Sequence, residues 1–428
     1  MTAREEAIVV GIDIGTSGVR AVAMAPDFSV LASGAAKLSE FSPDHRDPAV
    51  WRQAMRAALG RLFGSFADGN VVAVSIDGTS GTLLPVDAAG MPLAPPMMYN
   101  DPVTELAVLE AITAHAPRDS AAHGATSGLA KAISFQPLPD VHRVLHQADW
   151  LSGLLTGHFG ISDENNALKT GYDPIARRWP DWIADTGART DLLPQVRPAG
   201  EPVGTVTKAA SAEFGLPEGA AVVAGTTDGC ASFLATGAGR PGDGVSALGT
   251  TLTVKMLSDK PLFAPEYGLY SHRIGDMWLA GGASNTGGIV LSQYFGNEEI
   301  ARLSARLDPT VETGLDYYPL AKPGERFPIN DPALAPRMSP RPQSDEDFLK
   351  ALFEGIASVE ALAYARLAEL GAPKLACVRS VGGGAANEAW KVIRTRRLGV
   401  PFPPVLSEEA AAGAARLALS GAEKAGLL

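Results

Sequence analysis

Apolar and polar positions along the chain follow two alternating periods. Strand-like apolar runs occur at residues 8–14, 71–77, 221–224, 244–248 and 252–254. Between them apolar residues recur at helical spacing, as after Asp47-Pro48, where Asp47 is the expected N-cap and Pro48 the first helical residue. A long helix is expected from Ser344 to near Gly371, and a last helix from Ser407. This alternation predicts an α/β fold.

The first strand run ends in a polar turn. Asp13 is followed by Gly15, Thr16, Ser17 and Gly18, and a second apolar run then continues the hairpin. Backbone N–H groups in such a turn form a concave anion site, and a carboxylate beside it could hold a hydrated Mg²⁺. The natural ligand of this arrangement is a nucleotide phosphate. An ordinary Gly-rich hairpin with Asp in its turn is the alternative.

Similar turns of Gly, Thr and Asp end later strands. They are Asp77-Gly78-Thr79-Ser80, Gly225-Thr226-Thr227-Asp228-Gly229, Gly249-Thr250-Thr251 and Gly382-Gly383-Gly384 with Asn387. The unit near residue 13 and the unit near residue 249 are weakly alike, which is consistent with a duplicated domain. We place the expected boundary close to residue 225, so that the domains are 1–225 and 226–428.

Length, charge and cysteine usage restrict the possible classes. A chain of 428 residues is too long for one typical core, which agrees with two domains. A net charge of −11 argues against nucleic acid or an anionic membrane as partner. Cys230 and Cys377 are too few for a disulfide framework, which favours the cytoplasm. Arg4, Glu5 and Glu6 precede a short apolar run that is neither a signal peptide nor a spanning segment.

The order of these turns resembles the FGGY family of carbohydrate kinases, which is built on the actin-like (ribonuclease H-like) ATPase duplication. The resemblance implies an α/β protein of two actin-like domains with a cleft between them. The first domain would be the sugar side with the first phosphate turn, and the second the nucleotide side with the base at its start. Five runs resemble the short D-ribulose kinases of the cyanobacterial and plant type: residues 145–151, 165–173, 270–273, 281–288 and 316–320.

The resemblance also implies roles for single residues. Asp228 would be the general base that takes the proton of the attacking sugar hydroxyl, although locally it reads equally well as the N-cap of a helix. Asp13 would hold Mg²⁺ through water. The β- and γ-phosphates of ATP would meet Gly15, Thr16 and Ser17 of one turn and Gly249, Thr250 and Thr251 of the other. The adenosine turn would be Gly382, Gly383, Gly384 and Asn387.

The sugar pocket is expected at a strand end of the first domain, formed by Asp77, Gly78, Thr79 and Ser80 together with Asp228. Asn100 and Asp101 fall where the family carries a tryptophan-containing, sugar-contacting segment, and this chain lacks that tryptophan. A lone Asn-Asp-Pro is also a common turn. Lys131 could reach the cleft, or it could be a solvated surface lysine.

These implications predict a Mg²⁺- and ATP-dependent kinase that phosphorylates a pentulose, first of all D-ribulose at its 5-hydroxyl. The same chemistry on D-xylulose, L-ribulose or another polyol is the first alternative. An actin-fold ATPase acting as a chaperone or filament protein, and a sugar sensor without catalysis, are the others. The expected partners are a small sugar and ATP, without nucleic acid or membrane, in a monomer or homodimer.

Overall fold

The computed structural model describes residues 7–65 and 70–428, so that Arg4, Glu5 and Glu6 lie outside the described residues. The chain forms two compact units. The first unit contains residues up to Ala235 together with His272–Gly275 and Glu409–Leu428, and the second contains Thr236–Ser271 and Asp276–Glu408. The first unit thus continues past residue 225 and includes the last helix of the chain.

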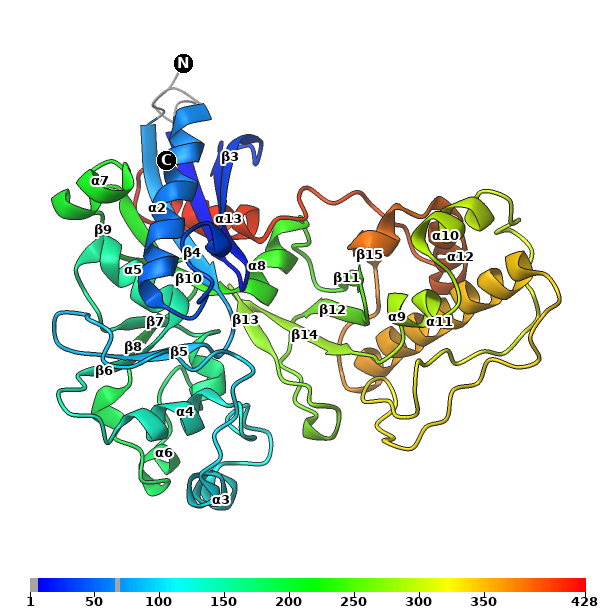
Figure 1. Ribbon diagram of the computed structural model, residues 1–428, viewed down its shortest axis with the longest axis horizontal. Helices are drawn as coiled ribbons and strands as arrows, with labels where there is room; N and C mark the ends of the chain where they lie inside the picture. The colour runs from blue at the N-terminus through cyan, green and yellow to red at the C-terminus, as the bar shows by residue number, and fades with distance from the viewer. Residues whose placement is uncertain (1–6, 66–69) are drawn as a thin grey trace. The chain divides into compact units, whose positions relative to one another are not determined.

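A six-stranded sheet of order β3-β2-β1-β4-β10-β9 forms the centre of the first unit (Figure 1). Its strands are β1 (Ala7–Ile14), β2 (Gly18–Met24), β3 (Val30–Lys37), β4 (Asn70–Gly78), β9 (Pro202–Thr205) and β10 (Ala221–Thr227). The three central strands β1, β4 and β10 run parallel, whereas β2, β3 and β9 are antiparallel to their neighbours. Because parallel strands end at the same edge, the polar turns after β1, β4 and β10 lie on one side of the sheet.

Helices cover both faces of this sheet. The amphipathic helix expected after Asp47 is α2 (Pro48–Ser65), which packs on β2 and β3 in one hydrophobic core with Val10 and Ile12. The opposite face carries α13 (Ala410–Lys424), which packs with Val9 and on β4 and β10. Alternate residues of β1 therefore face different helices, as strand geometry requires. Figure 1 shows the blue α2 and the red α13 on either side of the strands.

Residues outside this sheet form a third core of the first unit, which includes Leu129, Val144 and Ile183. Two small sheets pair β5 (Leu83–Val86) with β6 (Arg143–His146) and β7 (Ile161–Asp163) with β8 (Gln195–Arg197). The helices are α3 (Leu106–His115), α4 (Gly128–Phe135), α5 (Gln147–Thr156), α6 (Trp182–Asp185), α7 (Lys208–Phe214) and α8 (Asp228–Ala235).

The second sheet has the order β13-β14-β12-β11-β15. Its strands are β11 (Asp243–Leu248), β12 (Leu252–Ser258), β13 (His272–Ile274), β14 (Met277–Ala283) and β15 (Cys377–Val381). The helices of the second unit are α9 (Gly288–Ser292), α10 (Asn297–Ser304), α11 (Asp345–Glu369) and α12 (Glu388–Leu398). The helix expected from Ser344 is confirmed as α11, and the Ser344 hydroxyl caps it by accepting a hydrogen bond of 3.3 Å from the Asp347 N–H.

The start of the last helix differs from the prediction. A first turn at Ser407 with Glu408 and Glu409 was expected, but α13 begins at Ala410 and Glu409 has an extended backbone. Both carboxylates bind elsewhere. Glu408 accepts a hydrogen bond of 3.2 Å from the Gly382 N–H, and Glu409 forms an ion pair of 3.1 Å with Arg20. Acidic residues near a helix start thus mark the region of the start, but not its first residue.

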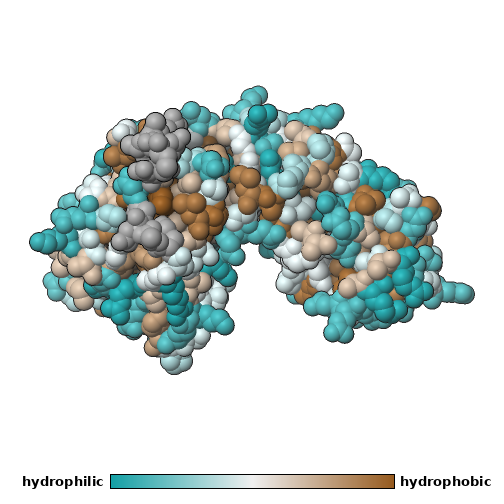
Figure 2. All heavy atoms as spheres, turned by 90° about the horizontal axis from the view of Figure 1, so that it is seen from above, coloured by the Kyte–Doolittle hydropathy of each residue, from teal (hydrophilic) through white to brown (hydrophobic). Residues whose placement is uncertain are grey.

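The chain as described has no helix long and apolar enough to cross a membrane. Large apolar side chains that reach the surface are spread over both units, and they include Phe28, Met91, Ile175 and Val311. Figure 2 shows apolar side chains in several separate groups among hydrophilic ones. Scattered exposure of this kind is usual for folded proteins.

Candidate active site

Three carboxylates lie at the ends of the central strands of the first unit. Asp13, the last residue but one of β1, is directly opposite Asp77 near the end of β4. On its other side, Asp77 is opposite Thr226 of β10, two residues before Asp228. The charges of all three aspartates act on one another. The structure therefore brings together Asp13, Asp77 and Asp228, which are far apart in the sequence.

Asp228 is the first residue of α8 and is partly exposed. Its carboxylate accepts a hydrogen bond of 2.6 Å from the next backbone N–H, that of Gly229. An N-cap side chain accepts a hydrogen bond from an N–H group of the first helical turn. Here the Thr227 hydroxyl accepts such a bond, from the Cys230 N–H at 3.4 Å. Asp228 thus lies in the first turn, where the helix dipole favours a negative charge, and Thr227 takes the capping role that Asp228 could have had.

The other two carboxyls lie deeper. Asp77 is fully buried, and burial together with the neighbouring Asp13 raises its pKa well above the usual range. Burial also raises the pKa of Asp13, and the charge of Asp228 adds to this effect. The Arg20 guanidinium lies 3.8 Å from the Asp13 carboxylate. Three carboxyl groups therefore lie close together at this sheet edge.

The carboxylates at this sheet edge are possible ligands of Mg²⁺. No group of three or more His, Cys, Asp or Glu side chains among residues 7–65 and 70–428 is placed to hold a metal ion by itself. Mg²⁺ commonly takes one or two carboxylates and completes its shell with waters and phosphate oxygens. The carboxyl groups gathered at this sheet edge are of the kind that could hold an ion in this way.

The first hairpin connects β1 and β2 by a tight turn. The Gly15 N–H donates to the Gly18 carbonyl at 3.0 Å, so Thr16 and Ser17 form the tip, and both are exposed. The Ser17 carbonyl accepts a hydrogen bond of 3.0 Å from the Leu38 N–H, which fixes the tip against the chain after β3. The hydroxyls expected to meet phosphate are therefore accessible on a rigid turn.

The second phosphate turn predicted from the sequence connects β11 and β12. Gly249 and Thr250 are exposed at its tip. Their carbonyl oxygens accept hydrogen bonds of 2.9 Å from the N–H groups of Gly288 and Ile289 at the start of α9. A Cβ atom on Gly288 would lie 2.8 Å from the Gly249 oxygen, so this close approach requires glycine.

A pocket of about 630 Å³ lies beside this turn within the second unit. Its lining combines the turn with α9, α10 and the Gly-rich segment before α12, and includes Gly249, Thr250, Gly383, Gly384 and Asn387. Trp390 forms part of the wall and stacks on Phe353 with ring centres 4.7 Å apart. The structure thus joins most of two sequence-predicted turns in one pocket; Gly382, at the start of the second turn, has a φ of +84°.

Asn387 has two roles in that pocket wall. Its side-chain oxygen accepts a hydrogen bond of 3.0 Å from the Trp390 N–H and so caps α12. Its amide nitrogen donates to the Ser304 hydroxyl of α10 at 2.8 Å. The two bonds hold α10 and α12 on either side of the opening, and both ends of the Asn387 amide are used in doing so.

The predicted sugar residues lie at different depths. Asp77 and Thr79 are buried, Ser80 is partly exposed, and Asn100 is exposed. Gln147 on α5 was not expected in this group, yet its carbonyl oxygen accepts from the Thr79 N–H at 3.2 Å and the Thr79 hydroxyl at 2.8 Å. Within the described part of the chain, Ser80 Oγ and Gln147 Nε2 are buried without a hydrogen-bond partner, which marks this place as polar and unsatisfied.

Sequence reasoning also missed the role of Lys131, for which exposure to solvent or to the cleft was expected. Its side chain is fully buried, and its ammonium donates to two backbone carbonyls. The signal that could have indicated burial is its position on an otherwise apolar helix, α4. Asp101, the second residue of the Asn-Asp pair, binds Arg46 through two hydrogen bonds of 2.8 and 3.0 Å.

Comparison with known proteins identifies the family. Residues 136–235 match the N-terminal domain of the FGGY family of carbohydrate kinases, and residues 244–422 match the C-terminal domain. The two matches together cover more than half of the chain, so the chain belongs to this family. It is accordingly an ATP-dependent sugar kinase, which transfers a phosphoryl group to an alcohol.

Individual relatives share between 25% and 29% sequence identity with this chain. A xylulose kinase of Staphylococcus epidermidis is 26% identical over 442 residues, covering 97% of this chain and 88% of that protein. An autoinducer-2 kinase of Yersinia enterocolitica is 29% identical over 65% of this chain and 57% of that protein. The crystal structure of a xyloylose kinase from Brucella ovis has a TM-score of 0.83 at 25% identity, covering 97% of this chain and 91% of the other. These similarities confirm the two-domain α/β fold and do not determine the substrate.

Proposed function

We propose that this chain transfers the γ-phosphoryl group of MgATP to a hydroxyl of a pentulose, with Asp228 as the general base. The observation that supports this proposal most is the position of Asp228, next to Asp13 and Asp77 at the end of three parallel strands. Phosphoryl transfer needs a carboxylate that orients the attacking hydroxyl and accepts its proton. Asp228 is the most accessible of the three, because it is partly exposed whereas Asp77 is fully buried.

Asp13 is the residue that would hold Mg²⁺. When bound, the ion would neutralise charge on the phosphates of ATP. The exposed Thr16 and Ser17 hydroxyls follow Asp13 on the same turn and would bind phosphate oxygens, while Gly15, whose N–H donates to the Gly18 carbonyl, would keep the turn closed. Gly249, Thr250 and Thr251 would supply the corresponding turn of the second unit.

The pocket beside Trp390 would receive the adenosine. Its volume of about 630 Å³ suits a ligand of nucleoside size. Gly383 and Gly384 line it without side chains, which lets the backbone approach a flat base. Gly382 would shape the turn through its positive φ, and Asn387 would hold the wall in place.

The sugar would contact the turn after β4. Asn100 is exposed, whereas the hydroxyl oxygen of the partly exposed Ser80 is buried, so we assign direct contacts to Asn100 and to Asp228. Asp77, Gly78 and Thr79 would act from beneath, because all three are buried. The unsatisfied Ser80 hydroxyl supports a polar ligand at this place.

For the choice of pentulose, the relatives favour D-xylulose over the D-ribulose that the sequence motifs suggested, because the Staphylococcus epidermidis relative is a xylulose kinase. D-Ribulose stays the second candidate through the resemblance of residues 165–173 and 281–288. The two sugars are epimers, so the orientation of a single hydroxyl group distinguishes them.

The test is ADP release from MgATP with D-xylulose, D-ribulose, L-ribulose, L-xylulose, ribitol and glycerol. We expect turnover with one pentulose and a loss in kcat of about 10²- to 10⁴-fold for Asp228→Asn. Asp119→Asn, which changes an exposed carboxylate away from the sheet edge, is the matched control and keeps full activity. Wild-type turnover in Asp228→Asn would overturn the base assignment, and no sugar-dependent ADP release at all would overturn the function.

A further inference from the structure

A buried lysine connects the two segments that the proposed function assigns to the sugar. Lys131 lies on α4 and has no exposed surface. Its ammonium donates a hydrogen bond of 2.7 Å to the Gly81 carbonyl and one of 2.6 Å to the Met98 carbonyl. Gly81 ends the turn that begins at Asp77, and Met98 precedes Tyr99, Asn100 and Asp101. One side chain therefore joins the two segments from beneath.

The same two segments are joined at a second point. The Tyr99 N–H donates to the Thr82 hydroxyl oxygen at 3.0 Å, and Thr82 shares a hydrogen bond of 2.6 Å with the Thr79 hydroxyl. Thr79 is in turn bound by Gln147. The links through Lys131 and Thr82 leave the two segments little freedom to separate.

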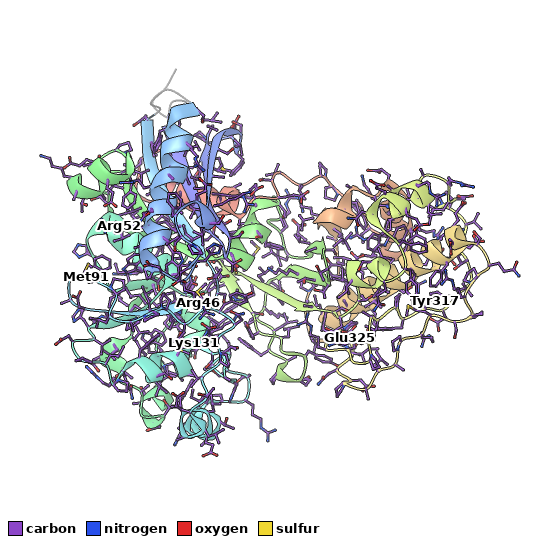
Figure 3. The ribbon with its side chains drawn as sticks, in the orientation of Figure 1. Arg46, Arg52, Met91, Lys131, Tyr317 and Glu325 are labelled. Atoms are coloured by element: carbon purple, nitrogen blue, oxygen red, sulfur yellow. The ribbon has the colours of Figure 1, made fainter. Side chains whose placement is uncertain are left out.

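The charged side chain of Asp101 fixes the end of the segment of residues 98–101. Asp101 accepts a hydrogen bond of 2.8 Å from the Met98 N–H and closes a turn around Tyr99 and Asn100. Arg46 binds the same carboxylate, and the negative charge of Asp101 also favours the Lys131 ammonium. Figure 3 shows Arg46 and Lys131 in the same region of the first unit.

Burying an ammonium group is costly, on the order of several kcal/mol, unless its donors are satisfied. An apolar side chain would fill the space under α4 without that cost, so the charge has to be explained by its two bonds. Hydrogen bonds from a charged donor are shorter and stronger than neutral ones. Their effect here is to set the distance between two backbone carbonyls.

Resting on the proposed function, we propose that Lys131 is a positioning residue for the sugar: it holds the Gly81 and Met98 segments at the separation the pentulose requires. Lys131 has no accessible surface and does not touch the substrate. Its loss should weaken sugar binding and leave ATP binding unchanged. Lys131, Gly81 and Met98 all belong to the first unit.

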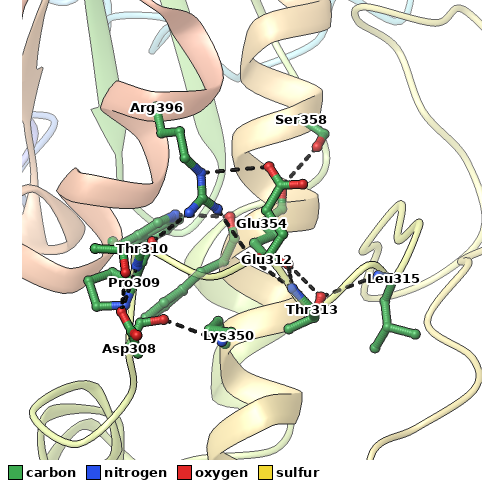
Figure 4. Close-up of polar contacts among 12 residues, drawn as sticks. Asp308, Pro309, Thr310, Glu312, Thr313, Leu315, Lys350, Glu354, Ser358 and Arg396 are labelled. Carbon is green, nitrogen blue, oxygen red and sulfur yellow. Dashed lines mark hydrogen bonds and ion pairs between the residues drawn. The ribbon is translucent and has the colours of Figure 1, made fainter.

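The experiment compares Lys131→Met with Lys350→Met. Lys350 is also a nearly buried lysine bound to a backbone carbonyl, that of Asp308 at 3.3 Å, but it lies in the second unit (Figure 4). We expect Lys131→Met to raise the KM of the pentulose about tenfold or more, equivalent to about 1.4 kcal/mol, with the KM of ATP within twofold. Lys350→Met should change neither, and Lys131→Arg, which keeps the charge, should fall between wild type and Lys131→Met.

Hydrogen exchange tests the same claim without sugar or activity. Amides of residues 79–82 and 97–101 should exchange faster in Lys131→Met and at the wild-type rate in Lys350→Met. Unchanged exchange and an unchanged sugar KM would overturn the proposal, as would equal effects on both KM values. If Lys131→Met does not fold, the sugar KM and exchange of Lys131→Arg decide. An inactive wild type would refute the function, and the exchange result would still decide the role of Lys131.

Discussion

The side-chain amide of Asn165 donates a hydrogen bond of 2.9 Å to the hydroxyl of Thr226, two residues before Asp228. Asn165 also exchanges two hydrogen bonds of 2.9 Å with the backbone of Arg273. Asn165 is buried, so its three bonds are shielded from water. Asn165, which is far from β10 in the sequence, thereby fixes the end of that strand.

From this contact we expect Asn165→Ala to reduce the free energy of unfolding by about 1–3 kcal/mol, because buried partners are left unsatisfied. The measurement is urea unfolding of wild type, Asn165→Ala, Thr226→Val and the double variant. A coupling energy of about 0.5 kcal/mol or more between the two positions would confirm the contact. Strict additivity would show that the bond contributes nothing.

A second prediction concerns a buried ion pair in the second unit. Arg394 binds Glu360 through two hydrogen bonds of 2.6 and 2.7 Å, and both side chains are almost completely buried. Glu360→Leu alone leaves the guanidinium buried without its charge partner and should cost about 3–5 kcal/mol. Glu360→Leu combined with Arg394→Leu should cost clearly less in the same urea titration. If the double variant is the less stable one, the pair itself stabilises the unit.

A third prediction concerns the turn that we assign to phosphate. Glu325, labelled in Figure 3, is buried. It accepts hydrogen bonds from the Ser284 hydroxyl at 2.5 Å, the Asn285 N–H at 2.7 Å and the Tyr318 hydroxyl at 3.0 Å. The Ser284 N–H in turn binds the carbonyl of Leu252, directly after the turn.

Because hydrogen bonds to a charged acceptor contribute about 1.5–3 kcal/mol, Glu325→Gln should raise the KM of ATP about tenfold. The KM of the sugar should stay unchanged. Glu369→Gln, on an exposed glutamate at the end of α11, is the control in the same kinetic assay. An unaltered KM for ATP in folded Glu325→Gln would show that the Gly249–Thr251 turn does not depend on Glu325.

A fourth prediction concerns stability against pH. Burial lowers the pKa of Lys131 from 10.5 to about 8; Asp101 opposes this shift, and Lys169 adds to it. Between these two values the unfolded chain binds more protons than the folded one, so the contribution of Lys131 to stability rises with pH over that range. Below about pH 8 the full cost of burying the charge is present.

The difference in unfolding free energy between wild type and Lys131→Met should therefore change in favour of wild type from about pH 8 to about pH 10.5. Urea unfolding at several pH values in this range measures it. A constant difference across the range would mean that Lys131 keeps an ordinary pKa.

Much of the site could be predicted because its signals are local. A β-branched run followed by Asp13 and a Gly-Thr-Ser-Gly turn predicts a hairpin through the strand period and turn chemistry. The same reasoning applies to β4, which contains Asp77, and to β10, which Asp228 follows. It also applies to α2, which is predicted by the spacing of its apolar residues. In each case neighbouring residues alone decide the conformation.

Contacts between distant residues required the tertiary structure. The positions of the similar turns suggested a division near residue 225, yet Glu409–Leu428 packs in the first unit. The reason is steric: a Cβ atom on Gly11 of β1 would collide with the backbone of Ala411 and Ala415, so α13 lies directly on the strand. The burial of Lys131, the Gln147 contact with Thr79 and the pairing of Asp13 with Asp77 are of the same kind. The sequence by itself determined the strands, turns and chemical groups, because these follow from local periodicity. Only tertiary packing decided which of these groups meet, because this depends on shape complementarity between segments far apart in the chain.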